Sequence, residues 1–353
     1  MNALRKLVLP LAALVWVTTW VVAAHPQAAT GSEESPPAYS PTQQVSGTIR
    51  IWGHGGRGKD LDGPLVQSWE QSFRKYQPNV RFENQLRGNS SAIGGLYTGA
   101  ADLAFMEREI WPTEIDAYDQ VFGHKPSSVP AMTGSVDVPN HAFALVIFVH
   151  KDNPLQKLTL PQLDAIFGAD HRRAPKNIRK WGELGILGEW ADKPIHPYGY
   201  ELKGSFSYFF EQAVLAGSEK WNCDLKEIAD SPTLGKPIDA GQLILEQLAG
   251  DRYGIAISSL AYKNSATKPM ALAGTSGKAY YPATRENVMR HSYPLTRTAR
   301  IYFDRALGQP LDPKLKEFLS YIVSRQGQAE VLQHGKYLPL TSEGVQEAHR
   351  ALQ

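Results

Sequence analysis

The chain has 353 residues, of which 42% are hydrophobic and 20% charged, which is enough apolar sequence for two domains of ordinary size. Its 37 Lys and Arg residues nearly balance 35 Asp and Glu residues. No long basic run occurs, so nucleic acid is not an expected partner. Cys223 is the only cysteine, which excludes an internal disulfide.

The N-terminal residues are expected to direct export. Arg5 and Lys6 precede an apolar run that ends at Ala24 after small residues, which is typical of a cleavable signal peptide over residues 1–24. The alternative is an uncleaved membrane anchor, although the run is close to the lower length limit for a spanning helix. Residues 25–45 are rich in Pro, Ser, Gln and Glu and predict a disordered spacer. The sequence thus predicts a periplasmic protein.

The first predicted elements alternate between strand and helix. Residues 48–52 are strand-like, and residues 65–76 carry apolar side chains at helical spacing until Pro78. Ser90 is a candidate N-cap of a second helix, and residues 102–106 are typical of a buried strand. This alternation predicts α/β layers with mainly parallel strands.

The rest of the chain continues the alternation. In chain order we expect a strand, a short helix, a surface loop, two helices, two strands and one long closing helix, at residues 142–150, 160–167, 181–185, 206–215, 240–249, 254–257, 298–303 and 314–334.

Three strand-like runs are each followed by a short Gly/Ser-rich loop and then a helix-like segment. The loops lie at residues 53–58, 88–91 and 203–205. The backbone N–H groups at the start of a helix have no intrahelical partner, and they hold anions readily. Three such loops behind an export signal favour capture of an anion outside the cell.

The order of the segments resembles one known family over about residues 46–343. Seven stretches match the phosphate-binding, periplasmic substrate-binding proteins of ABC transporters, namely residues 86–109, 143–168, 180–185, 199–215, 253–262, 293–303 and 318–340. The resemblance implies an α/β type II periplasmic binding protein fold. In that fold two α/β lobes are joined by a two-strand hinge, and the ligand binds in the cleft between them. It places residues 46–138 and 299–353 in lobe I and residues 139–298 in lobe II.

The resemblance also implies a set of ligand-binding residues. They belong to the three loops and to the carboxylate after the third strand: Gly56, Arg57, Asn89, Ser90, Ser91, Glu107, Tyr200, Lys203, Gly204 and Ser205. The family carries an arginine in the third loop, where this chain has Tyr200 and then Lys203. Lys203 supplies a point charge but not the bidentate fork of a guanidinium. The exact anion is therefore left open. The alternative to ligand binding is a purely structural role for each of these residues, as a turn glycine, a helix cap or a solvated charge.

The sequence favours a binding protein over an enzyme. Residues 53–59 nearly spell a nucleotide-binding loop, but Asp60 stands where that motif needs Ser or Thr. No nucleophile elbow and no metal-ligand spacing occurs, so no catalytic residue, cofactor or metal is expected. We expect a monomer that delivers inorganic phosphate or a similar small anion to an ABC transporter permease. The alternatives are a sensor or partner-binding module for another small anion, and a phosphoester hydrolase.

Overall fold

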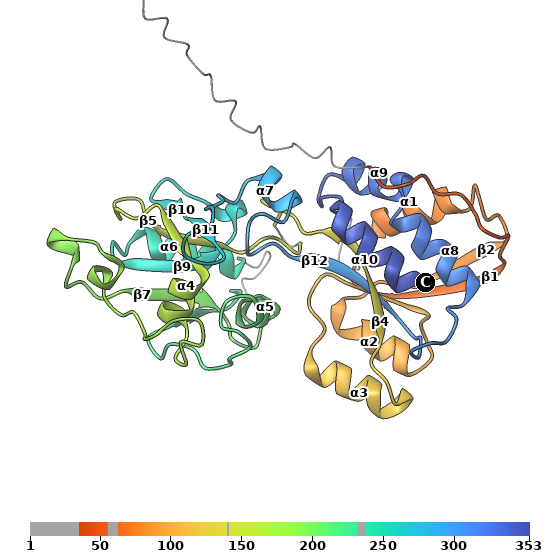
Figure 1. Cartoon of the computed structure of the whole chain (residues 1–353), viewed down its shortest axis with the longest axis horizontal. Helices are drawn as coiled ribbons and strands as arrows, with labels where there is room; N and C mark the ends of the chain where they lie inside the picture. Colours follow the sequence, from red (N-terminus) through yellow and green to blue (C-terminus); the bar gives the residue numbers. More distant parts are fainter. Residues whose placement is uncertain (1–34, 56–62, 140, 232–237) are drawn as a thin grey trace, which may run out of the picture. The chain divides into compact units, whose positions relative to one another are not determined.

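The computed structural model describes residues 35–55, 63–139, 141–231 and 238–353, and the expected signal peptide lies outside them. The described chain forms two five-stranded sheets, each covered by helices, and we call each sheet with its helices a lobe. Figure 1 shows the two lobes, and in both of them strands and helices alternate along the chain as expected. Within the described residues, no helix has the length and apolar character needed to cross a membrane.

The first lobe is built on the sheet β2-β1-β3-β12-β4. Its strands are β1 (Gly47–Gly53), β2 (Val80–Gln85), β3 (Leu103–Met106), β4 (Ser127–Thr133) and β12 (Thr298–Phe303). β1 is parallel to β2 and β3, whereas β12 is antiparallel to β3 and β4. The sheet is thus mixed, because the late strand β12 enters it from the other lobe.

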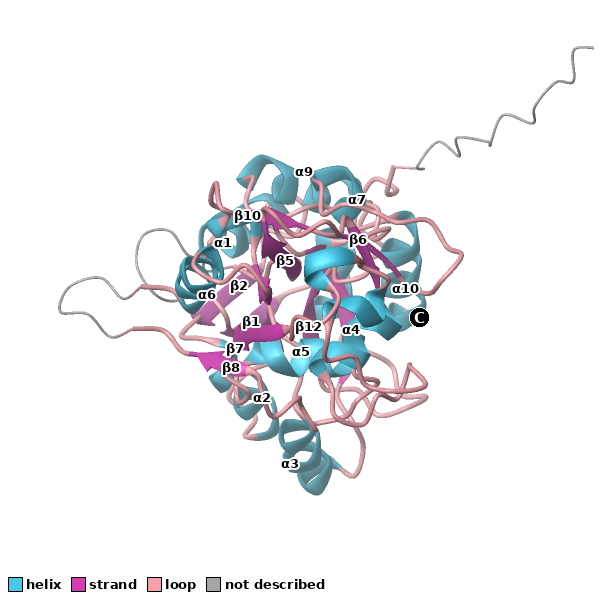
Figure 2. Ribbon diagram, turned by 90° about the vertical axis from the view of Figure 1, so that its left-hand side faces the viewer, coloured by secondary structure: helices cyan, strands magenta, loops and turns pink. Residues whose placement is uncertain are grey.

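Alternation along β3 divides the helices of the first lobe between the two faces of the sheet. Leu103 and Phe105 pack in one core and Ala104 and Met106 in another, as expected for side chains that alternate across a strand. The first core includes α1 (Gly63–Phe73), α8 (Pro313–Ile322), α9 (Arg325–His334) and α10 (Ser342–Leu352). The second includes α2 (Asn89–Tyr97) and α3 (Pro112–Phe122). In Figure 2, α9 and α10 lie at the periphery of the view, and the strands β1 and β12 lie near its centre.

The second lobe is built on the sheet β10-β5-β9-β7-β8. Its strands are β5 (Val146–His150), β7 (His196–Tyr200), β8 (Lys226–Ile228), β9 (Gly254–Ser258) and β10 (Thr267–Pro269). A small parallel pair is added by β6 (Lys157–Thr159) and β11 (Ala271–Ala273). The helices of this lobe are α4 (Leu160–Phe167), α5 (Ser205–Ala213), α6 (Ala240–Ala249) and α7 (Arg285–Met289), with short 3₁₀ turns at Trp181–Leu184, Gly188–Trp190 and Leu260–Tyr262.

Two segments of chain connect the lobes and lie side by side. The segment after β4 and the segment before β12 are hydrogen-bonded to each other, since the amide of Gly134 donates to the carbonyl of Arg297 (2.8 Å) and the amide of Leu145 donates to that of Leu295 (3.1 Å). The buried hydroxyl of Tyr293 also donates to the carbonyl of Leu145 (3.0 Å). These paired segments are the two-strand hinge.

Three expectations about elements differ from the structure. The closing helix expected at residues 314–334 is two helices, because α8 ends at Ile322 and Ser324 caps α9 by accepting the amide of Gly327 (3.3 Å). The surface loop expected at residues 181–185 begins with a fully buried Trp181. The strand expected at residues 142–150 begins only at Val146, because residues 142–145 belong to the hinge and are buried there.

Part of the segment expected to be a disordered spacer is ordered on the first lobe. Among the described residues 35–45, Tyr39 is buried and its hydroxyl donates to Glu317 (2.6 Å). The backbone carbonyl of Pro37 accepts the amide of Arg325 (2.9 Å). Low hydrophobicity alone did not reveal this packing, because it depends on one aromatic side chain and on hydrogen bonds to α8 and α9.

Replacing Gly241 with alanine is expected to destabilise the second lobe. A Cβ there would lie 2.6 Å from the hydroxyl of Tyr200 and 2.6 Å from the ring of Tyr262. Both neighbours are packed aromatic side chains, so we expect a loss of about 2 kcal/mol in the free energy of unfolding, as is usual for overpacking. Urea denaturation measures the loss. Gly274→Ala is the control, because nothing lies within 4 Å of its Cβ. Equal stability of the two variants would contradict the prediction.

Candidate functional site

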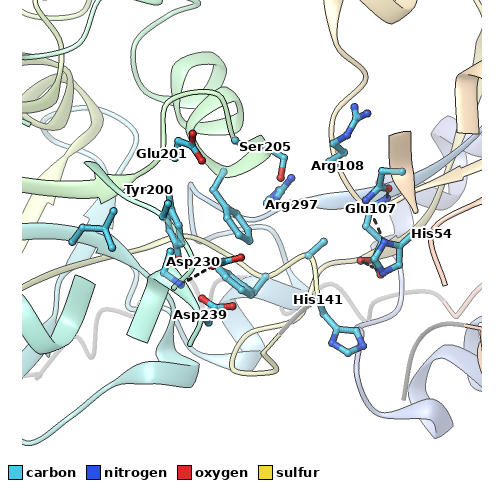
Figure 3. Close-up of a pocket in the computed structure, with 18 residues that line it drawn as sticks. His54, Glu107, Arg108, His141, Tyr200, Glu201, Ser205, Asp230, Asp239 and Arg297 are labelled. Atoms are coloured by element: carbon cyan, nitrogen blue, oxygen red, sulfur yellow. Dashed lines mark hydrogen bonds and ion pairs between the residues drawn. The ribbon is translucent and has the colours of Figure 1, made fainter. Parts of the chain in front are cut away.

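A pocket of about 380 Å³ is lined by residues of both lobes. Most of its residues follow the carboxyl ends of strands or begin helices, which is where open α/β sheets place their ligands, and the rest lie on the hinge. Figure 3 shows Glu107 and His54 of the first lobe facing Tyr200 and Asp239 of the second. The lining consists of His54, Asn89, Glu107, Arg108, His141, Ala142, Phe143, Tyr200, Glu201, Gly204, Ser205, Phe206, Ile228, Ala229, Asp230, Asp239, Ala240 and Arg297.

Asn89, His54 and Glu107 form a hydrogen-bonded group on the first-lobe wall. The side-chain oxygen of Asn89 accepts the amide of Glu107 (2.9 Å), and its nitrogen lies 3.2 Å from Nδ1 of His54. Nε2 of His54 lies 3.0 Å from Oε2 of Glu107, as the dashed line in Figure 3 indicates. Glu107 is only 4% exposed. Asn89 thus holds a carboxylate and an imidazole together in the pocket wall, where they can accept a proton from a ligand and donate one.

Two buried arginines line the pocket and are each paired with a carboxylate. Arg108 donates from Nη1 and Nη2 to Glu114 (2.8 and 2.6 Å) and lies over the ring of Trp111. Arg297 donates from Nε and Nη2 to Glu109 (3.2 and 2.7 Å). Neither carboxylate lines the pocket itself. The pairs therefore place two guanidinium groups at the pocket while partly balancing their charge.

Two helices, one from each lobe, begin at the pocket without a side-chain cap. α2 begins at Asn89 after Gly88, and α5 begins at Ser205 after Gly204. The N-cap residues, Gly88 and Gly204, have no side chain to cap the first amides of these helices. The N-terminus of a helix carries a partial positive charge from its unpaired N–H groups. The two helix starts therefore add favourable potential for an anion on both sides of the pocket.

Tyr200 occupies the third-loop position where the resemblance leads one to expect an arginine. It is buried, and its ring centre lies 4.6 Å from that of Phe206 at a tilted angle. Phe206 in turn stacks at 4.6 Å on Phe143. Burial raises the pKa of the Tyr200 hydroxyl well above its ordinary value, and the charge of Asp239 adds to this effect. The residue therefore contributes a neutral aromatic wall and no positive charge.

The second-lobe wall also carries acidic side chains. Asp239 accepts the amide of Gly241 and Asp230 accepts the amide of Ala240, each at 2.8 Å, so both are attached to the start of α6. Glu201 lies at the exposed rim. An ionised carboxylate accepts hydrogen bonds only. The pocket is therefore suited to an anion that also carries a proton to donate.

The structure brings five of the residues predicted from sequence into one pocket: Asn89, Glu107, Tyr200, Gly204 and Ser205. The other predicted serines lie elsewhere. Ser90 is exposed and outside the lining, and the hydroxyl of Ser91 donates to the carbonyl of Gly88 (3.0 Å). Gly56 and Arg57 lie outside the described residues.

Lys203 does not lie in this pocket either. It is exposed and lines a separate hollow with Trp111, Tyr208 and Glu219. Ser205, two residues later, lines the main pocket, whereas Lys203 does not. We therefore expect Lys203→Ala to change anion affinity less than two-fold, although the resemblance implies that Lys203 contacts the ligand. Titration calorimetry measures this, and a ten-fold loss would contradict it.

Sequence reasoning missed Arg297 and gave Arg108 only as one of several cations able to turn inward, although both lie in stretches that carry the resemblance. A signal for Arg108 was its position directly after Glu107 at the end of a predicted strand. Arg297 gave no signal, because it precedes the strand that returns to the first lobe and only the fold brings it to the pocket. Among the described residues, no group of three or more His, Cys, Asp or Glu side chains is arranged to hold a metal ion.

Comparisons with known proteins agree with this architecture. A family model described as a PBP superfamily domain matches residues 56–326. The phosphate-binding protein PstS of Pseudomonas aeruginosa is 33% identical over 344 residues, which cover 97% of this chain and 98% of that protein. PstS from Borrelia burgdorferi has a TM-score of 0.54 at 15% identity, covering 84% of this chain and 99% of its own. An ABC-type phosphate transport receptor from Vibrio cholerae has a TM-score of 0.51 at 17% identity, and the match covers 82% of this chain and 99% of that one.

Two lobes, a two-strand hinge and a pocket at the ends of both sheets define a binding protein of the type II periplasmic class. Because their sequence identity to this chain is low, the two solved structures show only that the fold is shared. The family match and the relative from Pseudomonas aeruginosa go further. The chain belongs to the PBP superfamily and, within it, to the phosphate-binding, PstS-like periplasmic substrate-binding proteins of ABC transporters.

Proposed function

We propose that this protein captures inorganic phosphate outside the cytoplasmic membrane and delivers it to an ABC transporter permease. The observation that carries the proposal is the pocket itself, where two uncapped helix starts from opposite lobes meet two arginines and a buried carboxylate. Helix starts and guanidinium groups stabilise an oxyanion. The contribution of both lobes to one pocket means that a bound anion favours the closed arrangement of the hinge.

The carboxylate of Glu107 accounts for a preference for phosphate over sulfate. Monohydrogen phosphate presents oxygens to N–H donors and still has one O–H to donate, which Glu107 is placed to accept. Fully ionised sulfate has no proton to donate, so its oxygens would be repelled by the same carboxylate. The carboxylates of Asp230 and Asp239 on the second-lobe wall also favour phosphate over sulfate, for the same reason.

The named relatives support the remaining parts of the proposal. The relative from Pseudomonas aeruginosa is called a phosphate-binding protein, and the neighbour from Vibrio cholerae a phosphate transport receptor. We propose by analogy that this protein is a periplasmic monomer without catalytic activity, exported by residues 1–24 and working with a permease. The strands that make up each sheet support the assignment of residues 46–138 and 299–353 to lobe I and of residues 139–298 to lobe II.

The direct test is titration calorimetry of the chain without its first 24 residues against phosphate, with sulfate as the comparison anion. We expect a dissociation constant in the micromolar range or tighter, about −8 kcal/mol or more favourable. Phosphate should also raise the melting temperature in proportion to its occupancy. No heat and no thermal shift with phosphate, together with a shift from another anion, would replace phosphate by that anion and favour a sensor or partner-binding module.

A further inference from the structure

We propose that Arg297 is the guanidinium that binds the ligand anion, and that it divides its hydrogen bonds between this anion and Glu109. The inference rests on the proposed function, because it assigns a residue to that site. Neither the sequence nor the family resemblance pointed to Arg297, which lies on the hinge rather than on a ligand loop.

Contacts with both lobes hold Arg297 in place. Its side chain is 1% exposed and is paired with Glu109 of the first lobe. Its guanidinium carbon also lies 5.1 Å from the ring centre of Phe206 and 5.2 Å from that of Phe209, both on α5 of the second lobe. A cation over aromatic faces is stabilised most when it is shielded from water. One side chain thus reaches from the hinge to the helix start where the pocket lies.

The charges around Arg297 leave room for an anion. The uncapped start of α5 carries a partial positive charge and lies beside the guanidinium, so the two repel each other. Glu109 is the only carboxylate paired with Arg297 among the described residues. An oxyanion bound near Ser205 would lie between the guanidinium and the helix start and would be attracted by both.

Unused hydrogen-bonding capacity distinguishes Arg297 from the other cations. Its nitrogen Nη1 donates to none of the described residues. Both Nη nitrogens of Arg108, in contrast, are bonded to Glu114, and Nη1 also donates to the carbonyl of Glu109. Lys203 lines a different hollow. A guanidinium has five N–H donors. Arg297 uses two of them on described residues and Arg108 uses three, so Arg297 keeps the larger share, with a whole Nη group left for a ligand in the pocket.

If Arg297 is shared in this way, Glu109 competes with the ligand. Neutralising Glu109 would leave the buried guanidinium with the ligand as its main anionic partner, so the affinity for phosphate should rise. A purely structural ion pair behaves differently, because losing either partner would distort the pocket and lower the affinity. A shared Arg297 and a purely structural ion pair thus predict opposite effects of a Glu109 substitution on the affinity for phosphate.

The experiment compares phosphate titrations of the wild type with Arg297→Gln, Arg297→Lys, Glu109→Gln and Arg300→Gln. We expect Arg297→Gln to weaken binding by roughly 20-fold or more, and Arg297→Lys by less, because lysine keeps the charge but loses the fork. Glu109→Gln should tighten binding by roughly three-fold. Arg300 is the matched control, since it lies three residues later on β12, is paired with Glu347 and does not line this pocket. Its variant should bind like the wild type.

Wild-type affinity in Arg297→Gln would overturn the proposal, and so would equal weakening by Arg297→Gln and Glu109→Gln. If Arg297→Gln does not fold, Glu109→Gln decides, since tighter binding supports the proposal and weaker binding rejects it. A wild type that ignores phosphate but binds another oxyanion would reject the phosphate assignment alone. The same four variants titrated with that oxyanion would then test Arg297 by the same comparison.

Discussion

Replacing Glu107 with glutamine should weaken phosphate binding by about 2 kcal/mol, roughly thirty-fold, and should let sulfate compete. The reason is that Glu107 is almost completely buried in the pocket wall, where the side-chain amide of Asn89 fixes its backbone. As a carboxylate it accepts the proton of monohydrogen phosphate. As an amide it would turn a donor toward any oxyanion, so the discrimination between phosphate and sulfate should fall.

Parallel titrations with phosphate and sulfate at neutral pH measure this change. Glu107→Asp is the matched control, because it keeps the carboxylate and shortens it by one methylene, and it should retain most of the preference for phosphate. Glu201→Gln removes a charge from the exposed rim of the same pocket and should have little effect. Unchanged selectivity in Glu107→Gln would show that the carboxylate does not meet the ligand, and that the pair with His54 is its only role.

The elements with strong local signals were predictable from sequence. α4, α6 and β12 begin and end where the patterns placed them, because the apolar residues are regularly spaced there and Thr159 and Asp239 cap the two helices. The break between α8 and α9 was not predicted. Apolar spacing continues across Ser324, and only its hydroxyl, which accepts the amide of Gly327, shows that a second helix begins. A serine inside a helical pattern does not reveal this by itself.

The site was predictable where residues stand at fixed places in the fold. Asn89 and Ser205 begin helices and Glu107 follows a strand, so local order already directs them toward the ends of the sheets. Arg297 depends on contacts that no local pattern encodes, since its partner Glu109 lies 188 positions earlier in the chain. Lys203 lies in the predicted loop but lines a separate hollow, which the order of residues in the loop does not reveal.

Replacing Glu114 with alanine should lower the free energy of unfolding by about 3 kcal/mol, the lower end of the cost of breaking a buried ion pair. Arg108 is 6% exposed and both of its Nη groups are bonded to this carboxylate. Removing the carboxylate leaves a guanidinium that is largely shielded from water and has lost its counter-charge. Glu114 also accepts the amide of Trp111 (2.9 Å) at the start of α3, so part of the loss comes from the cap.

Glu114→Gln separates these two contributions in urea denaturation, because glutamine can still accept the amide of Trp111 but carries no charge. We expect it to lose most of the same stability, since the charge on Arg108 is the larger effect. Phosphate should stabilise both variants more than the wild type, because Arg108 lines the pocket and a bound anion would supply the missing counter-charge there. If Glu114→Gln is as stable as the wild type, Arg108 is solvated through the pocket. The positive charge that it presents to a ligand would then be correspondingly screened.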